Sequence, residues 1–257
     1  MTESQHSIQS EKPFPLIWPS VGWAVLYLVL QLVIGIAAVA AVFVPVAMHD
    51  HTLAQHMPKG LKAMFAIPGF AYALYASVIV PAVIMLLIFW WILRAKGRGT
   101  RIGLFAPSQL SLVKTLGLGA ALLLTAWAFE TFYSRYIYDM KDAQQFIQLL
   151  ITALPNTIPN VIIKLLAIVI AGPLVEEVLF RGYLQNALKA KLPTHFAIIL
   201  TAIIFALYHM EPGAIPTLAI VGLAIGYFYH YTGSLKWSMA LHMSNNLVAL
   251  LATLYGS

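Results

Sequence analysis

The chain has 257 residues, of which 61% are hydrophobic and only 9% are charged, and its mean hydropathy is +0.84. Soluble domains carry roughly 25% charged residues, so this composition predicts an integral membrane protein. The formal net charge is +6, but the basic residues stand in short loops beside apolar runs. There they act as topology signals, and nucleic acid is not predicted as a partner. The sequence has no cysteine, which excludes thiol catalysis, disulfides and cysteine-ligated metals.

The first half of the sequence predicts a polar tail and three membrane helices. Residues 1–17 are polar and mixed in charge, and they lack the basic-then-apolar pattern of a cleaved signal peptide. The N-terminal helical region, residues 18–134, contains three apolar runs of the length that a spanning helix needs, roughly 20 residues. These runs cover residues 21–48, 65–93 and 116–132.

The loop at residues 94–101 sets the predicted orientation, because it holds the densest basic cluster in the chain. The positive-inside rule places this loop in the cytoplasm, and alternation then puts the N-terminus inside as well. The same alternation leaves residues 135–160 outside, residues 189–191 and Lys236 inside, and the C-terminus outside. The expected location is the cell membrane, with the lipid bilayer as the surrounding partner.

Residues 135–160 predict a short interfacial segment rather than a span. Apolar side chains in this mixed-charge stretch repeat at helical three-and-four spacing, at Phe146, Leu149, Leu150, Ala153 and Leu154. One apolar face on a short helix is typical of an amphipathic helix that lies on the membrane surface.

The region 161–257 contains four further apolar runs, at residues 161–190, 196–209, 215–231 and 237–254. The whole chain is therefore predicted to be all-α, a polytopic transmembrane bundle of about seven spanning helices plus the interfacial helix. Gly222 and Gly226 form a G-x-x-x-G pair, which allows two helices to approach closely.

Two adjacent carboxylates and an arginine interrupt the fourth of these seven runs. Charged groups at membrane depth cost at least about 2.5–3.5 kcal/mol each on insertion scales. Glu177 and Arg181 are four residues apart, so on a helix they can neutralise each other. Glu176 points roughly 100° away from Glu177 and has no such local partner. Its cost is the one that the local sequence leaves unexplained.

Three more polar side chains stand in apolar runs that follow. In a hairpin turning near Pro193, Glu176 and His209 reach nearly the same depth. His242, with Asn246 one turn later on the same face, would lie roughly 10 Å nearer the cytoplasm than Glu176 on straight helices. Helix tilt or a broken helix must absorb that difference if the groups are to meet.

The set of side chains suits hydrolysis. A carboxylate and an imidazole can hold and deprotonate one water, and a second imidazole and an amide can donate to the oxyanion that forms. Alternatively, Glu176, His209 and His242 could bind zinc as a site of two histidines and one glutamate.

The motifs Glu-Glu-x-x-x-Arg (Glu176, Glu177, Arg181), Phe-x-x-x-His (Phe205, His209) and His-x-x-x-Asn (His242, Asn246) occur in that order. The chain from about 161 to 254 thereby resembles the CPBP family of intramembrane proteases, also called the CAAX-processing or Abi family. The resemblance implies that residues 161–257 form a catalytic helical core.

The resemblance also implies roles for single residues. Glu176 would activate the water with help from His209, while His242 and Asn246 would stabilise the oxyanion. Glu177, Arg181 and Phe205 would support them. We favour a metal-free glutamate mechanism without a cofactor, with zinc as the alternative. The substrate would be a membrane peptide or a lipid-modified protein.

A second class of function fits the same residues. A non-catalytic membrane protein, such as a bacteriocin-immunity or transporter-like factor, could use the polar cluster as structural glue or as an ion path. The two classes differ in whether Glu176 and His209 are required for cleavage of a peptide.

Overall fold

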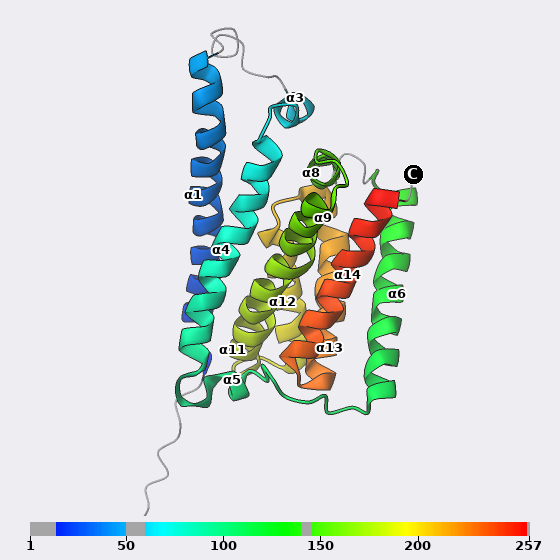
Figure 1. Cartoon of the computed structure of the whole chain (residues 1–257). Coiled ribbons are helices and arrows are strands. Elements are labelled where there is room, and N and C mark those ends of the chain that lie inside the picture. The colour runs from blue at the N-terminus through cyan, green and yellow to red at the C-terminus, as the bar shows by residue number, and fades with distance from the viewer. Residues whose placement is uncertain (1–13, 50–59, 140–144, 256–257) are drawn as a thin grey trace, which may run out of the picture.

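The computed structural model describes residues 14–49, 60–139 and 145–255. Within these ranges every regular element is a helix (Figure 1). The long helices stand side by side along one axis, so the predicted all-α membrane bundle is confirmed. Most of the predicted polar tail lies outside the described residues.

The N-terminal part forms one helix pair and a separate helix. Helix α1 (Ile17–His49) packs along α4 (Phe70–Leu93), and the short helix α3 (Leu61–Phe65) precedes α4. The second apolar run was predicted to begin at residue 65. The helix is interrupted between α3 and α4, where Gly69 has a φ of +87°. That left-handed conformation is unfavourable for other residues.

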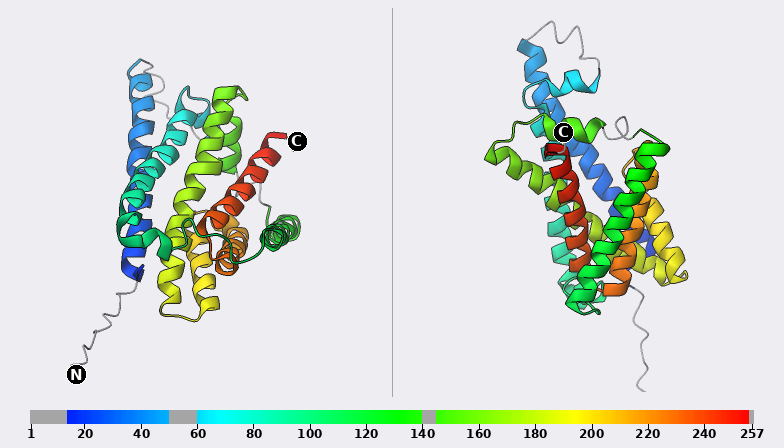
Figure 2. Two further views of the ribbon diagram at one scale, coloured as in Figure 1. Left: turned by 60° about the horizontal axis from the view of Figure 1, so that its bottom comes forward. Right: turned by 90° about the vertical axis from the view of Figure 1, so that its right-hand side faces the viewer.

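Helix α6 lies at the opposite edge of the bundle from α1 (Figures 1 and 2). The basic loop before it contains a 3-10 turn, η1 (Ala95–Gly97), and the single turn α5 (Arg98–Arg101). Helix α6 (Leu112–Tyr136) packs mainly on α13 (Ile215–Thr232).

A short helix, α8 (Gln145–Thr152), is present where the interfacial helix was predicted, and its place at the membrane surface stays a prediction. Its residues Leu150 and Ile151 are buried, and the Tyr75 hydroxyl donates a 2.9 Å hydrogen bond to the Leu150 carbonyl. With eight residues it is far too short to span, and it caps one end of the bundle beside α9 (Figure 1).

The fourth helix is continuous from residue 158 to residue 189, but it is not uniformly α-helical. It consists of α9 (Ile158–Lys164), η2 (Leu165–Ala171), α10 (Gly172–Glu177), η3 (Val178–Gln185) and α11 (Asn186–Lys189). Segments η2 and η3 are π-helical, and such wider turns are frequent at functional sites. Pro173 stands two residues after the end of η2 and lacks the N–H of a regular helical hydrogen bond, so it contributes to the irregularity.

The last three helices surround this irregular one. They are α12 (Thr194–Tyr208), α13 and α14 (Leu235–Tyr255), with a 3-10 turn η4 (Pro212–Ala214) before α13. A Cβ added to Gly222 would lie 3.2 Å from the Ala202 Cα, and one added to Gly226 would lie 3.0 Å from the Ile198 side chain. The packing role predicted for the glycine pair is therefore confirmed.

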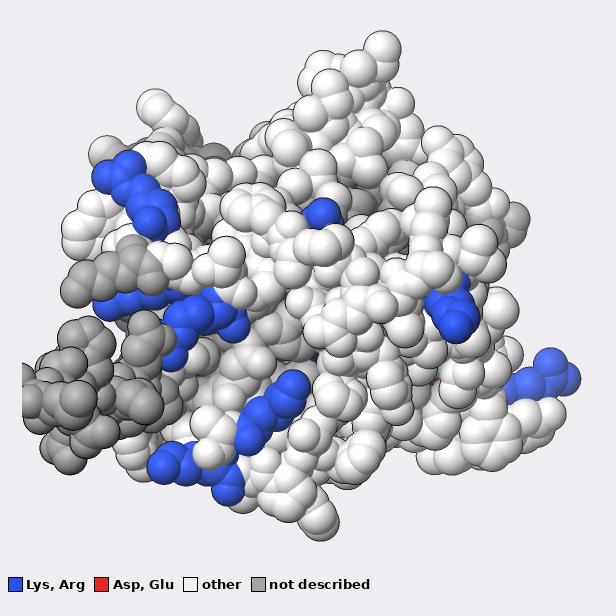
Figure 3. Space-filling model, turned by 90° about the horizontal axis from the view of Figure 1, so that it is seen from below, with Lys and Arg blue, Asp and Glu red and all other residues white. Residues whose placement is uncertain are grey.

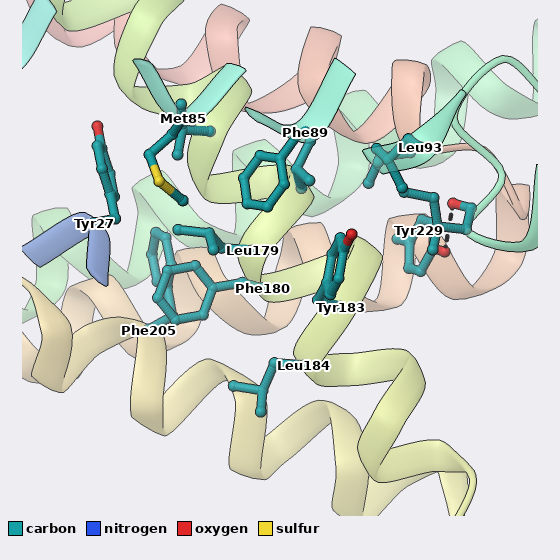
Figure 4. Packing of buried hydrophobic residues seen from close by; sticks show 14 of the residues in the cluster. Tyr27, Met85, Phe89, Leu93, Leu179, Phe180, Tyr183, Leu184, Phe205 and Tyr229 are labelled. Carbon is teal, nitrogen blue, oxygen red and sulfur yellow. Dashed lines mark hydrogen bonds between the residues drawn. The ribbon is translucent and has the colours of Figure 1, made fainter. Parts of the chain in front are cut away.

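One apolar cluster joins α1, α4, η3 and α12 (Figure 4). The rings of Phe180 and Phe205 meet edge to face at 5.2 Å, and Phe89 lies 5.5 Å from Tyr183. Because lipid tails are as apolar as these side chains, close packing rather than exclusion from water stabilises such contacts.

Five helices of the described ranges are long and apolar enough to cross a membrane: Ile17–His49, Phe70–Leu93, Leu112–Tyr136, Ile158–Lys189 and Pro212–Thr232. Helix α12 has 15 residues, which is short for a bilayer core of about 30 Å. All seven predicted runs are helices, and the number of spans stays a prediction.

The basic residues of the loop 94–101, together with Lys189, Lys191 and Lys236, lie at one end of the bundle (Figure 1). Figure 3 shows this end face, where almost all the charged surface is basic. The guanidinium groups of Arg98 and Arg101 lie over the Phe14 ring, at 5.4 and 5.5 Å. The start of α1 and the basic loop therefore share one end, as the predicted topology requires; that this end is cytoplasmic stays a prediction.

Candidate active site

Glu177 is the centre of a buried hydrogen-bond network. Its side chain has no exposed surface, and its Oε1 accepts hydrogen bonds of 2.8 Å from Arg181 Nη1 and 2.8 Å from His242 Nδ1. Its Oε2 accepts a 2.7 Å bond from the Ser238 hydroxyl. The predicted pairing of Glu177 with Arg181 is confirmed, and the pair also holds a histidine from another helix.

Arg181 is fixed on its other side by α12 and α13. Its Nη2 donates a 3.0 Å hydrogen bond to the Gly222 carbonyl, and its guanidinium lies 4.7 Å from the centre of the Phe205 ring. One turn later, Gln185 donates a 3.0 Å bond to the Gly226 carbonyl. Both carbonyls of the G-x-x-x-G pair thus accept hydrogen bonds from side chains of η3, and the bond from Arg181 helps to compensate its buried charge.

His242 connects the two carboxylates. Its Nδ1 bonds to Glu177, which directs Nε2 toward Glu176, 3.8 Å from Oε2 of that carboxylate. The straight-helix estimate placed His242 well below Glu176, but the structure brings them to the same level. Segment η3 lies between Glu176 and the turn near Pro193, and α14 is inclined in the bundle, so neither helix has the straight geometry of that estimate (Figure 1).

Glu176 is the accessible carboxylate of the pair. Its side chain is 15% exposed, whereas that of Glu177 is 0% exposed. This carboxylate is therefore available to a ligand while its neighbour is not.

His209 lies at the end of α12 and is less closely joined to the others. Its Nδ1 is 2.8 Å from the Phe205 carbonyl, and its ring meets the Phe205 ring at 4.7 Å. The Phe205 ring also contacts the ring of His242, with 5.8 Å between the ring centres. Among the described residues no hydrogen bond or ion pair joins His209 to Glu176. The predicted meeting of these two groups is therefore seen only as a shared neighbourhood around Phe205.

Asn246 is oriented by contacts on both of its amide atoms. Its Nδ2 donates a 3.0 Å bond to the Ile168 carbonyl in η2, and its Oδ1 accepts a 3.3 Å bond from Asn245. Asn245 in turn accepts a 2.9 Å bond from the Trp127 indole of α6. Because an amide nitrogen carries two hydrogens, Asn246 keeps one for a further acceptor.

The segment that carries these side chains also matches a known family. Residues 158–248 match the family described as type II CAAX prenyl endopeptidase Rce1-like. This segment is Rce1-like. It contains every site residue predicted from the sequence, and the resemblance to the CAAX-processing family is confirmed over it.

A curated relative of the chain is an uncharacterized 24.3 kDa protein of Escherichia coli. It is 33% identical over 101 residues, which make up 37% of this chain and 46% of the relative. The aligned part thus spans about half of that relative's length. No solved structure matches the chain.

The side chains of the Rce1-like segment do not form the zinc site considered from the sequence. Across residues 14–49, 60–139 and 145–255, no three His, Asp or Glu side chains come together as metal ligands. Glu176 and His242 are close, but His209 turns to the carbonyl of its own helix. We therefore derive no step through a metal.

Several side chains of the network were not predicted. Ser238 stands one turn before His242 on α14, and this spacing was a usable signal. Asn245, the neighbour of Asn246, donates a hydrogen bond to it. Trp127 comes from a helix outside the Rce1-like segment, and no local pattern connects this residue to it.

Proposed function

We propose that the protein is an intramembrane endopeptidase that hydrolyses a peptide bond of a membrane-associated substrate. The observation that supports this most is the buried network of Arg181, Glu177 and His242, which turns one imidazole nitrogen toward the more exposed Glu176. Such an arrangement of fixed donors beside one available carboxylate suits acid–base catalysis.

In the proposed reaction, Glu176 takes a proton from a water, and the water oxygen attacks the carbonyl carbon of the substrate. The electron pair of the carbonyl moves to its oxygen, and His242 Nε2 and the Asn246 amide donate hydrogen bonds to that oxyanion. In this role both nitrogens of His242 carry protons. The intermediate then collapses, the C–N bond breaks, and Glu176 returns the proton to the departing amine. His209 helps to orient the water.

The proposed substrate class is a membrane peptide or a lipid-modified protein. The family that residues 158–248 match is described as acting on CAAX prenyl proteins, which supports a lipid-modified C-terminus as the first probe. We place the protein in the plasma membrane with its N-terminus in the cytoplasm, on the basis of its basic end.

The test uses purified protein in lipid vesicles and a farnesylated peptide that ends in a CAAX sequence. We expect wild-type protein to release a C-terminal fragment, detected by mass spectrometry, and both Glu176→Gln and His209→Gln to release none. His195→Gln is the matched control, because His195 lies at the other end of α12 and contacts Tyr227. Unchanged cleavage by Glu176→Gln would refute the mechanism. A peptide that stays intact with the wild-type protein as well as with the variants would favour a non-catalytic membrane protein.

A further inference from the structure

Helix α1 carries one amide side chain along its apolar length, and that side chain reaches the helix of His209. Gln31 is the only amide or charged residue between residues 21 and 48. Its Oε1 accepts a 3.2 Å hydrogen bond from the hydroxyl of Tyr208, the last residue of α12. The ring of Tyr27, one turn earlier on α1, stacks on the same Tyr208 ring, with centres 6.4 Å apart and planes 11° from parallel. Helix α1 thus holds the end of α12 through one side chain, by a hydrogen bond and a ring contact.

The end of α12 is also where the orientation of His209 is decided. The His209 backbone N–H donates a 3.2 Å hydrogen bond to the Ala206 carbonyl, although the regular α-helical acceptor would be Phe205, four residues back. The Phe205 carbonyl lies instead 2.8 Å from Nδ1 of the His209 ring. Because a carbonyl only accepts, Nδ1 carries the proton, and the lone pair of the neutral ring is on Nε2. The last turn of α12 therefore sets both the direction and the tautomer of this imidazole.

The chain leaves this turn in an unfavourable conformation. Met210, directly after His209, has a φ of +54°, in the left-handed region that favours glycine. Helix ends fray unless further contacts hold them. The Tyr208 ring supplies such contacts, because it meets the His209 ring at 6.3 Å and the Phe180 ring of η3 at 5.4 Å, both edge to face. The side chain that α1 holds is therefore the one that secures the turn.

We propose that Gln31 and Tyr208 are positioning residues for the proposed hydrolysis. The Gln31 amide holds the Tyr208 hydroxyl, and Tyr208 keeps the last turn of α12 in place. That turn keeps Nε2 of His209 where it orients the nucleophilic water. The inference rests on the proposed function and gives α1, which lies outside the Rce1-like segment, a part in it. In this role neither positioning residue exchanges a proton.

The first test is kinetic. Tyr208→Phe and Gln31→Met each remove one half of the hydrogen bond and keep most of the side-chain volume. With the farnesylated CAAX peptide in vesicles, we expect each variant to lower kcat about fivefold or more with KM within about twofold of wild type, because His209 is placed less well. The double variant should lose no more than the more affected single variant, since both changes break the same bond. A kcat within about twofold of wild type for both single variants, or losses that multiply in the double variant, would overturn the proposal.

Tyr72→Phe is the matched control. The Tyr72 hydroxyl of α4 donates a 2.9 Å hydrogen bond to Oδ1 of Asn160 in α9, so it also joins a tyrosine to an amide on another helix. Asn160 precedes Glu176 by sixteen positions on the fourth helix, roughly 24 Å along its axis. We expect this variant to keep the wild-type kcat. A loss equal to that of Tyr208→Phe would show a merely structural effect and would count against positioning.

A second measurement does not depend on cleavage. Protein with isotope-labelled histidine in lipid nanodiscs gives a ring-nitrogen resonance for His209, assigned by its absence in His209→Gln. We expect this resonance to shift in Tyr208→Phe and Gln31→Met and to stay in place in Tyr72→Phe, because only the first two changes release the turn. An unchanged resonance in both overturns the proposal. An inactive wild-type protein, or an active Glu176→Gln, counts against the proposed function instead, so the two failures are distinguishable.

Discussion

Replacing Arg181 with methionine tests the buried network most directly. Methionine keeps much of the length of the side chain but removes its charge and its donors. The variant loses the 2.8 Å bond to Glu177, the 3.0 Å bond to the Gly222 carbonyl, and the contact with the Phe205 ring. It leaves the Glu177 carboxylate fully buried without its cation.

The expected cost follows from that isolated charge. Removing one partner of a buried ion pair typically destabilises a protein by about 3–5 kcal/mol, because the remaining charge is left uncompensated. Ser238 and His242 still bond to Glu177 in this variant. We therefore expect the loss of stability to lie near the lower end of that range, at about 3 kcal/mol. The double variant Glu177→Gln/Arg181→Met removes both charges of the ion pair together, so its loss should be about 2 kcal/mol smaller than the sum of the single losses.

The assay is reversible unfolding in mixed micelles with increasing SDS, followed by tryptophan fluorescence. Arg135→Met serves as the control, because Arg135 is exposed at the end of α6 and its guanidinium lies 5.8 Å from the centre of the Tyr136 ring. We expect this control to change stability by less than about 1 kcal/mol. A loss below about 1 kcal/mol for Arg181→Met, or strictly additive losses in the double variant, would refute the account of the network.

Three further predictions concern packing, positioning and metal. Gly222→Ala should lower stability by about 1–3 kcal/mol, because the new Cβ meets the Ala202 backbone at 3.2 Å, whereas Gly117→Ala has free space and should not; SDS unfolding compares them. Trp127→Phe should lower kcat several-fold with little effect on KM, because the hydrogen bond that helps to orient Asn246 through its neighbour is lost; peptide kinetics at saturating and limiting substrate decide this. Chelation with EDTA should leave cleavage unchanged, because we propose that Glu176 and not a metal activates the water. Metal found in the active protein, together with a loss of activity on chelation that zinc restores, would contradict this.

The sequence by itself determined the helices and the local pairs. Apolar runs located all seven long helices within a few residues at most boundaries, because the length of a run in a membrane protein is a direct consequence of bilayer thickness. The Glu177–Arg181 pair followed from the spacing of one helical turn, and close packing at the G-x-x-x-G pair followed from the lack of side chains. Each of these features depends only on residues near one another in the chain.

Only the tertiary structure decided which helices bring their side chains together. The structure places His242 2.8 Å from Glu177 and 3.8 Å from Glu176, although straight helices placed it elsewhere. The same packing turned His209 toward its own helix and brought Tyr27 from α1 beside Tyr208. Such contacts depend on the tilt, rotation and depth of separate helices, which local spacing does not specify.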